Sequence, residues 1–228
     1  MTDNNYVTLI DHMGDDLSVV NAARVSFGKR VLLDLSQYDD VEYERVFTQI
    51  PILQDRDIKL IKYLAKHNHW SPFGHASLQF HIKAPVFVAR QLVKHQVGLS
   101  WNEVSRRYVS DKPEFYIPFM WRKRPDKNIK QGSSKEEIEY DIMNVIDTTK
   151  DTYKDMLESG IAPEMARMIL PQCMMTEWLW SGSLYAFSRV CNLRNKDNAQ
   201  VETRMVTHNI EKHMRDHFPI CVRYLLDG

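Results

Sequence analysis

The stretch Arg90–Tyr108, RQLVKHQVGLSWNEVSRRY, gathers side chains that bind phosphates and bases into one short segment. Pro85 fits the first turn of a helix, and Gly98 ends it. The helix places four polar side chains on one face: Arg90, Gln91, Lys94 and His95. A second polar cluster follows the glycine and comprises Asn102, Glu103, Ser105, Arg107 and Tyr108. A helix that only filled a core would not carry these groups, and together they suit a nucleotide.

The segments on either side of this stretch alternate between helical and extended patterns. Apolar residues at helical spacing predict a helix over 55–68, and a strict alternation over 77–83 predicts a strand with Leu78, Phe80 and Ile82 on one face. Residues 105–109 and 115–117 could supply further short strands. The pattern is therefore a helix followed by strands.

The second half of the chain reads as almost entirely helical. Ser134 and Glu137 have the spacing of a capping box, which predicts a long helix up to Gly160. Pro163 begins another helix, and two more are expected over 174–194 and 198–218. The fold class is therefore α+β, with a small, mainly antiparallel sheet, packed helices and a helical C-terminal half. The segments 28–54 and 122–133 read as excursions without an assignable role.

The amino-acid composition limits the kinds of molecule that the protein is expected to bind and the compartment in which it is expected to occur. The 228 residues are 43% hydrophobic and include 30 basic and 30 acidic side chains. These charges cancel, so no global field favours nucleic acid or an anionic membrane, and an anion site must be a local cluster. We expect a cytoplasmic protein, because no apolar run approaches the length of a membrane span and no signal peptide is recognisable. The three cysteines form no CxxC pair and indicate small buried residues in a reducing compartment.

Two common types of site have no signature in the chain. His67, His69 and His75 lie close in sequence but lack the spacing of a helical zinc motif, and no cysteine supplements them, so we expect no metal. No GxGxxG fingerprint occurs, so any flavin must be bound in a different way from a Rossmann fold.

The chain resembles the flavin-dependent thymidylate synthases, the ThyX family. Ser100–Tyr108 reads S-x-N-E-x-S-x-R-Y, which is similar to the signature of that family. Further segments are similar to family segments in the same order: AARVSF at 22–27, HNHWSPFGH at 67–75, KAPVFVARQ at 83–91, EFYIP at 114–118, PEMARMILP at 163–171 and NLR at 192–194. The resemblance spans most of the chain, which implies a single domain over residues 1–228.

This chain departs from the family pattern at several positions. The family's Arg-His-Arg triplet is here Lys94-His95-Gln96, with one extra residue before the following motif. Lysine keeps the positive charge but loses the planar fork that binds phosphate at two points. Three other positions carry residues that are uncommon in the family: Gly74 in place of an acid, Arg189 in place of asparagine and Asn198 in place of histidine.

The resemblance implies reductive methylation of dUMP to dTMP. The carbon donor is methylenetetrahydrofolate, and the electrons come from FAD reduced by NADPH. The residues that match dUMP-binding positions are Gln91, Lys94, Glu103, Ser105, Arg107, Arg167 and Arg194. Those that match flavin positions, or lie near them, are Ser26, His69, Ser71, Lys94, His95, Gln96, Arg189 and Asn198. The family also implies a homotetramer with shared active sites, in which Arg107 reaches a neighbour's dUMP.

Two residues, Arg194 and Ser105, are expected to be catalytic. Arg194 would stabilise the uracil ring as negative charge develops on it. A serine nucleophile needs an adjacent base, and the nearest candidate in the sequence is Glu103. The resemblance favours a substrate-binding role for Ser105 over a covalent one.

Several structural readings remain open. Arg167 could be an ordinary surface ion pair, Arg194 could complement a helix dipole, and His69 could be a structural histidine in a turn. The chain could instead catalyse another C5 modification of a pyrimidine nucleotide, such as hydroxymethylation. It could also be a non-catalytic module that binds nucleotides or nucleic acid, although its neutral net charge and its Asn102-Glu103 pair argue against that reading.

Overall fold

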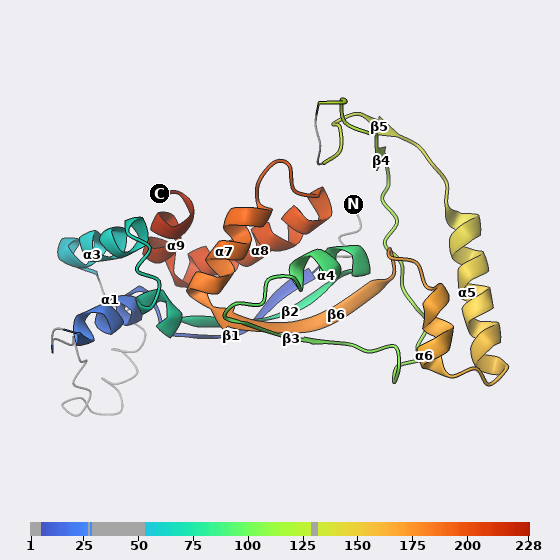
Figure 1. The fold of residues 1–228 in the computed structure, drawn as a ribbon, viewed down its shortest axis with the longest axis horizontal. Coiled ribbons are helices and arrows are strands. Elements are labelled where there is room, and N and C mark those ends of the chain that lie inside the picture. Colours follow the sequence, from blue (N-terminus) through green and yellow to red (C-terminus); the bar gives the residue numbers. More distant parts are fainter. Residues whose placement is uncertain (1–5, 27, 29–52, 129–131) are drawn as a thin grey trace, which may run out of the picture.

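The computed structural model describes residues 6–26, 28, 53–128 and 132–228. Its centre is a four-stranded antiparallel sheet in the order β1-β2-β6-β3. The strands are β1 (Tyr6–Met13), β2 (Ser77–Pro85), β6 (Met175–Ser183) and β3 (Leu99–Glu103). Figure 1 shows the helices α4 (Val86–Leu92), α7 (Leu184–Arg194) and α8 (Val201–His217) stacked above this sheet. The fold is therefore α+β, as the sequence predicts.

One face of the sheet is apolar and the other is polar. Leu78, Phe80 and Ile82 of β2 are buried, which confirms the predicted strand and its alternation. On the opposite face, the Gln79 amide donates to Ser181 Oγ over 2.9 Å, and His81 lies 3.1 Å from Glu177. This arrangement orients the sheet with its apolar side toward α7 and α8.

Three further helices close one end of the molecule. They are α1 (Asp16–Val25), α3 (Asp55–Lys66) and α9 (Pro219–Leu226), and α3 packs against both of the others. Asp16 accepts hydrogen bonds from the backbone N–H groups of Ile220 and Cys221, each over 2.9 Å, so that α1 caps the start of α9. The short helix η2 (Pro72–His75) connects α3 to β2 and packs against α1 and α7.

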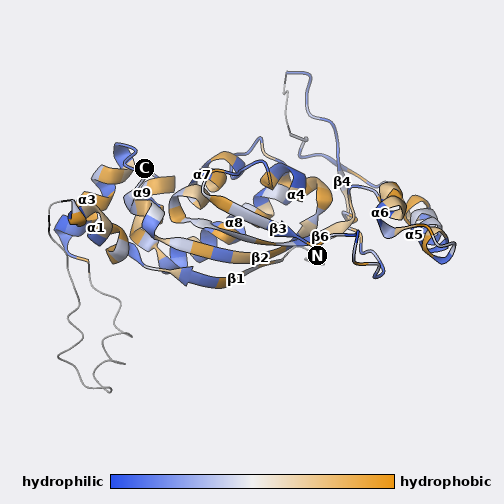
Figure 2. Ribbon diagram, turned by 60° about the horizontal axis from the view of Figure 1, so that its bottom comes forward, coloured by the Kyte–Doolittle hydropathy of each residue, from blue (hydrophilic) through white to orange (hydrophobic). Residues whose placement is uncertain are grey.

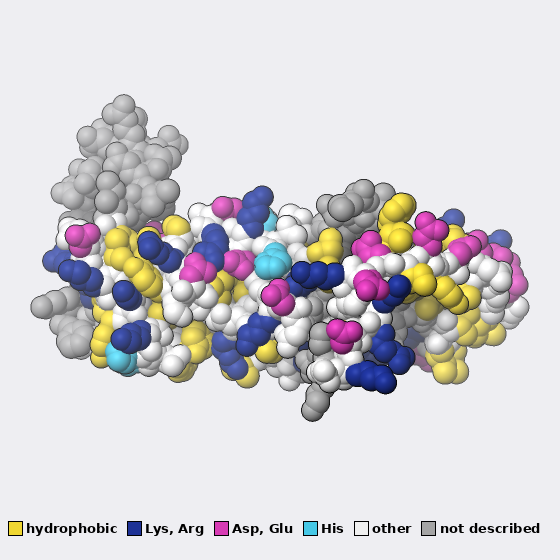
Figure 3. Space-filling view, turned by 90° about the horizontal axis from the view of Figure 1, so that it is seen from above, with side chains coloured by type: hydrophobic (Ala, Val, Ile, Leu, Met, Phe, Trp, Pro, Cys, Tyr) yellow, Lys and Arg dark blue, Asp and Glu magenta, His cyan; other side chains and the backbone are white. Residues whose placement is uncertain are grey.

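The opposite end is an arm formed by α5 (Met143–Glu158), α6 (Pro163–Ala166) and η3 (Arg167–Ile169). Figure 1 shows this arm beyond the end of the sheet; α5 follows the separate ladder of β4 (Trp121–Arg122) and β5 (Glu137–Ile138), and η3 leads back into β6. Large apolar side chains of the arm are exposed, including Met168 (72%) and Val145 (62%). Figure 3 shows hydrophobic side chains exposed on this end of the molecule.

Two predictions for the second half are wrong. The segment 174–194 is not one helix, because residues 175–183 form β6 and pair with strands on both sides. A helix begins only after Ser183, whose hydroxyl accepts from the Ala186 N–H over 3.2 Å. The long helix begins at Met143 rather than near Ser134, since Ser134 Oγ accepts from the Glu136 N–H in a turn and the chain then enters β5.

The central stretch also differs from its prediction. The helix that follows Pro85 ends at Leu92, so Lys94 and His95 lie in the turn after it and not on its face. Gly98 lies in that turn with φ +76° and precedes β3. Residues 105–109 contain a turn instead of a strand, and Phe115 makes only an isolated bridge to Met174.

The other predicted helices are confirmed within one or a few residues, as α3 and α8. Pro163 does begin a helix, although α6 is only four residues long. Cys191 and Cys221 are free and buried, and Cys173 is free and half-buried. None of the helices in the described part of the chain combines the length and hydrophobicity that a membrane span requires. Most of the excursion 28–54 lies outside the described residues.

Candidate functional site

Two clefts flank the C-terminal end of α7. The first, here the α3 cleft, has a volume of about 710 Å³ and lies between α7, α3 and α9. The second, here the α4 cleft, has a volume of about 600 Å³ and is bounded by α4, the end of α7 and the turn before α8. Leu193 and Lys196 line both. The end of α7 is therefore a ridge shared by two cavities.

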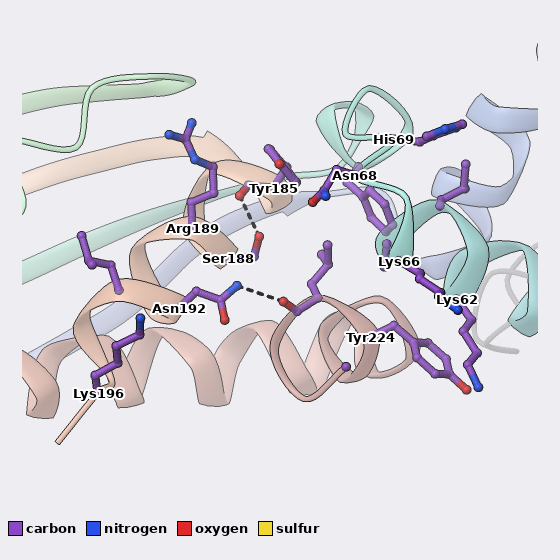
Figure 4. Close-up of a pocket in the computed structure, with 16 residues that line it drawn as sticks. Lys62, Lys66, Asn68, His69, Tyr185, Ser188, Arg189, Asn192, Lys196 and Tyr224 are labelled. Atoms are coloured by element: carbon purple, nitrogen blue, oxygen red, sulfur yellow. Dashed lines mark hydrogen bonds between the residues drawn. The ribbon is translucent and has the colours of Figure 1, made fainter.

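Basic side chains line the α3 cleft on two sides. In Figure 4, Arg189 and Lys196 belong to α7 and the turn after it, while Lys62 and Lys66 come from α3. These four side chains have no ion pair among the described residues, and no acidic side chain is among those that line the cleft. Unpaired cations in a concave site attract a polyanionic ligand.

The remaining lining of the α3 cleft is aromatic and amide-rich. Tyr185 and Tyr224 supply rings, and the Asn192 side-chain amide donates to the Leu225 carbonyl over 2.9 Å. His69 and Arg189, both predicted at flavin positions, line this cleft as well. Rings, amides and unpaired cations together match the chemistry of a dinucleotide, whose bases stack and whose diphosphate needs charged donors.

The α4 cleft is built around a hydrogen-bonded group from three elements. Arg194 Nε donates to His95 Nε2, and Arg194 Nη2 donates to the Gln91 carbonyl, each over 3.0 Å. The Gln91 side-chain amide donates to Gln200 Oε1 over 2.7 Å. The structure thus brings Gln91, His95 and Arg194 together, and Asn198 lines the same cleft.

His95 is held as a neutral acceptor in this group. Burial lowers its pKa below the ordinary imidazole value, and the positive charges of Arg194 and Arg189 lower the pKa further. Because its Nε2 atom accepts from Arg194, the ring proton lies on Nδ1. The uncharged ring can therefore fix the direction of the guanidinium without repelling it.

The turn that carries the cleft residues 196–200 is anchored to α8. Asn195 Nδ2 donates to Glu211 Oε2 over 2.6 Å, and Thr207 Oγ1 donates to Asn195 Oδ1 over 2.5 Å. Glu211 is paired in turn with Arg215 over 2.6 Å. These contacts anchor the start of the turn to α8 and so help to position the lining residues that follow it.

Four predicted dUMP-binding residues lie elsewhere in the chain. Glu103 is at the end of β3, where Thr176 and Trp101 donate to its two carboxylate oxygens. Ser105 follows it, and its hydroxyl accepts from Arg107 Nε over 3.3 Å. Arg167 is exposed on η3, in the arm. Among the described residues, no hydrogen bond joins any of these side chains to Gln91 or Arg194.

The other predicted residues have less defined positions. Lys94 and Gln96 are exposed in the turn after α4 and line neither cleft. Ser26 caps α1 and Ser71 precedes η2, both exposed. The described residues contain no group of three or more His, Cys, Asp and Glu side chains that could hold a metal ion.

Sequence reasoning missed several lining residues. These are Lys62, Lys66 and Tyr185 in the α3 cleft, and Arg122, Ser133 and Gln200 in the α4 cleft, together with the shared Lys196. Arg122 and Ser133 are the first and last residues of the excursion at 122–133. The basic and polar composition of this segment marked it as unusual, but did not indicate which part of the protein it would contact. The other residues come from elements that meet only in the folded chain.

The fold and the two adjoining clefts define an α+β protein with a site for anionic, nucleotide-like ligands. Residues 8–220 match the Thy1 family model, described as thymidylate synthase complementing protein. A flavin-dependent thymidylate synthase of Thermosipho africanus is 35% identical over 223 residues, covering 95% of this chain and 89% of the relative. Another, from Kosmotoga olearia, is 36% identical over 233 residues, covering 99% and 91%.

A solved structure has the same fold. The UMP/dUMP methylase PolB from Streptomyces cacaoi, bound with 5-Br dUMP, superposes with a TM-score of 0.75 and 26% sequence identity. The match covers 96% of this chain and 94% of PolB. The chain belongs to the family of the flavin-dependent thymidylate synthases.

Proposed function

We propose that the protein converts dUMP to dTMP by reductive methylation, with methylenetetrahydrofolate as the carbon donor and NADPH as the source of the hydride. The observation that carries this proposal is the pair of basic clefts on either side of one ridge. One cleft suits a nucleotide and the other a dinucleotide. The family membership of the chain supports the same activity.

The α4 cleft would hold dUMP. Gln91 and Gln200 present amide groups that match the donors and acceptors of a uracil edge. Arg194 would orient the ring and stabilise the negative charge that develops on it. Asn198, expected near the flavin, lines this cleft with Gln91 and would extend the same polar surface.

The α3 cleft would hold FAD, since its residues fit that group. Arg189 and Lys196 are cations without an ion pair in the described chain and would meet the diphosphate, while Tyr185 and Tyr224 offer rings for stacking. His69 would lie beside the cofactor. When bound, reduced FAD supplies the redox chemistry that no protein side chain provides. The protein residues bind, orient and exclude water.

A second subunit would complete the nucleotide site. Glu103, Ser105, Arg107 and Arg167 are not among the described residues that line the α4 cleft, yet they match family positions for dUMP. The exposed apolar arm offers a surface for self-association, because exposed apolar patches of this kind mark interfaces. These features support the expected homotetramer with shared sites. In it Ser105 binds substrate, since its hydroxyl contacts only Arg107 among the described side chains.

Residues 1–228 would act as one catalytic domain. A single buried cluster joins the N-terminal helix α1 to the sheet and to the C-terminal helices, and it includes Val20, Phe80, Phe187 and Val222. The family match covers nearly the same range. The three cysteines are free, which suits a reducing compartment such as the cytoplasm.

Anaerobic turnover with dUMP, methylenetetrahydrofolate and NADPH tests the proposal. The purified protein should be yellow from bound oxidised flavin, and the product should have the mass of dTMP. A hydroxymethylated product would favour the alternative C5 modification. A colourless protein that binds dUMP without turnover would favour a non-catalytic module and contradict the proposal.

A further inference from the structure

The β4–β5 ladder forms one wall of the α4 cleft, and the proposed function gives the residues of this wall no role. Arg122 of β4 and Ser133 line the cleft together with Gln91, Arg194 and Gln200. Gly132, between the two strands, lies close to the turn before α8, because a Cβ on it would be 3.7 Å from the Asn198 carbonyl oxygen. In Figure 2 the segment that carries this ladder is mainly hydrophilic and rises away from the sheet. Polar contacts must therefore hold it in place.

Arg122 makes those contacts. Its Nη2 atom donates to both carboxylate oxygens of Glu202, over 2.7 and 2.8 Å, and its Nε atom donates to Ser133 Oγ over 2.8 Å. The Glu202 side chain is only 4% exposed, and the Tyr116 hydroxyl also donates to it over 3.2 Å. A guanidinium held at two nitrogens has one orientation, which a lysine could not reproduce.

Glu202 connects this pair to the groups that face the nucleotide. It lies in the first turn of α8, where a carboxylate also complements the helix dipole. Gln200 is the N-cap residue of the same helix, and its side chain accepts from Gln91. Arg122 is thus joined through Glu202 and Gln200 to Gln91, whose carbonyl accepts from Arg194.

We propose that Arg122 is a positioning residue for the pyrimidine nucleotide. By clamping the β4–β5 ladder to the first turn of α8, it sets the width of the α4 cleft and the direction of the Gln200 and Gln91 amides. The described ends of the excursion, Arg122 with Gly132 and Ser133, then supply this wall. The inference rests on the proposed function, because it takes dUMP as the occupant of the α4 cleft.

The test compares flavin-loaded enzymes in steady-state kinetics and in calorimetric titration with dUMP. Arg122→Ala alone would leave the buried Glu202 carboxylate unpaired and destabilise the fold. The informative variant is therefore Arg122→Ala combined with Glu202→Gln, which removes both charges. We expect KM and Kd for dUMP to rise roughly 10- to 100-fold, by analogy with the loss that follows when a residue orienting a metal ligand is removed. The value of kcat per bound flavin and the flavin content should stay near those of the wild type.

A matched control lies on the same ladder. Lys123 and Glu136 form an ion pair over 3.0 Å that is exposed and lines neither cleft. Lys123→Ala with Glu136→Gln removes the same charges, and KM for dUMP should stay within twofold of the wild type, because exposed pairs contribute about 1 kcal/mol or less. If the double variant Arg122→Ala with Glu202→Gln does not fold, the Arg122→Lys variant tests the proposal instead. This variant keeps the positive charge but loses the planar guanidinium that binds at two nitrogens. The KM for dUMP should still rise, although less than in the double variant.

The possible results are distinct. A rise in KM for dUMP at constant kcat supports the proposal. A folded variant with the wild-type KM, or one that loses kcat and flavin together while KM is unchanged, would show that the clamp is only structural. A wild-type enzyme that does not bind dUMP at all would overturn the proposed function, and with it this role, whereas normal wild-type binding with unaffected variants overturns the role alone.

Discussion

His95 accepts a hydrogen bond from Arg194, which lines the α4 cleft, so a change in the charge of either residue would alter that cleft. Burial, Arg194 and Arg189 all lower its pKa below the ordinary value of 6.5. We expect the pKa to rise in an Arg194→Ala variant, because the neighbouring positive charge is lost and water gains access. The measurement is an NMR titration of enzyme with labelled histidine, with His95→Gln to assign the signal. An unchanged or lower value in the variant would contradict the assigned contact.

The same residue links stability to pH. Above pH about 6.5 the ring is neutral in both the folded and the unfolded chain, and its contribution is constant. Below that value the unfolded chain takes up a proton first, because the folded pKa is lowered. The free energy of unfolding therefore falls as pH drops from about 6.5 toward the folded pKa.

Arg194 should discriminate between the two ligands. It lines the α4 cleft but not the α3 cleft. We expect Arg194→Ala to weaken dUMP binding by roughly 1.5 to 3 kcal/mol, the usual loss for a charged hydrogen bond, with a much smaller effect on FAD. Calorimetric titration of each ligand measures both values, and the exposed Arg56→Ala variant should change neither. Equal weakening of dUMP and FAD would count against the assignment.

At the scale of elements, β6 depends on a residue without a side chain. A Cβ on Gly182 would lie 2.4 Å from Leu99 Cδ2 and 2.7 Å from the Gly98 carbonyl oxygen. We expect Gly182→Ala to displace β3 and to lower the free energy of unfolding by roughly 1 to 3 kcal/mol, as overpacking does. It should also disturb the turn that carries His95, which ends at Gly98.

Urea unfolding measures this effect, and Gly74→Ala is its control. A Cβ on Gly74 meets nothing closer than 3.7 Å, and the backbone there does not have a positive φ. This variant should unfold at nearly the wild-type concentration of urea. Equal midpoints for the two alanine variants would show that β3 can move at no cost.

The elements that sequence predicted correctly are those whose patterns are local. The strand over 77–85 and the helices over 55–66 and 201–217 carry their own periodicity. The segment 175–183 does not, since its run of Met, Trp and Leu fits a helix or a buried strand equally well. Pairing with β2 and β3 decides the outcome, and that information lies about 75 to 100 residues away in the sequence.

In the candidate site, too, residues in local sequence motifs could be predicted, and residues brought together only by packing could not. Gln91 and Arg194 could be predicted because they lie in recognisable motifs, and the structure joins them. Lys62 and Lys66 could not, since solvated lysines on a helix are common and only packing brings them to a cleft. The Ser134 capping box failed because the same spacing also occurs in a turn that leads into a strand.

At the scale of the whole molecule, the two halves of the proposed dUMP site are separated within one chain. Arg194 lies in the α4 cleft, and Arg107 is exposed beyond the end of β3. Mixed oligomers of Arg107→Ala and Arg194→Ala chains should therefore regain activity, because some sites combine an intact Arg107 from one subunit with an intact Arg194 from another. Each variant alone should be nearly inactive.

Chains with two different affinity tags allow mixed oligomers to be purified and assayed. The control mixes two differently tagged preparations of Arg107→Ala, which should recover nothing. If true mixed oligomers of the two variants show no activity above that of either parent, Arg107 and Arg194 do not serve one site from different subunits.

The ridge at the end of α7 has a thermodynamic consequence. Lys196 and Leu193 face both cavities, so a ligand that fixes them on one side changes the cost of binding on the other. The two ligands are then heterotropic effectors of each other. Whatever factor FAD applies to the affinity for dUMP, dUMP must apply to the affinity for FAD, since the coupling free energy belongs to the ternary complex and not to either partner. The coupling free energy is therefore the same whichever cavity is filled first.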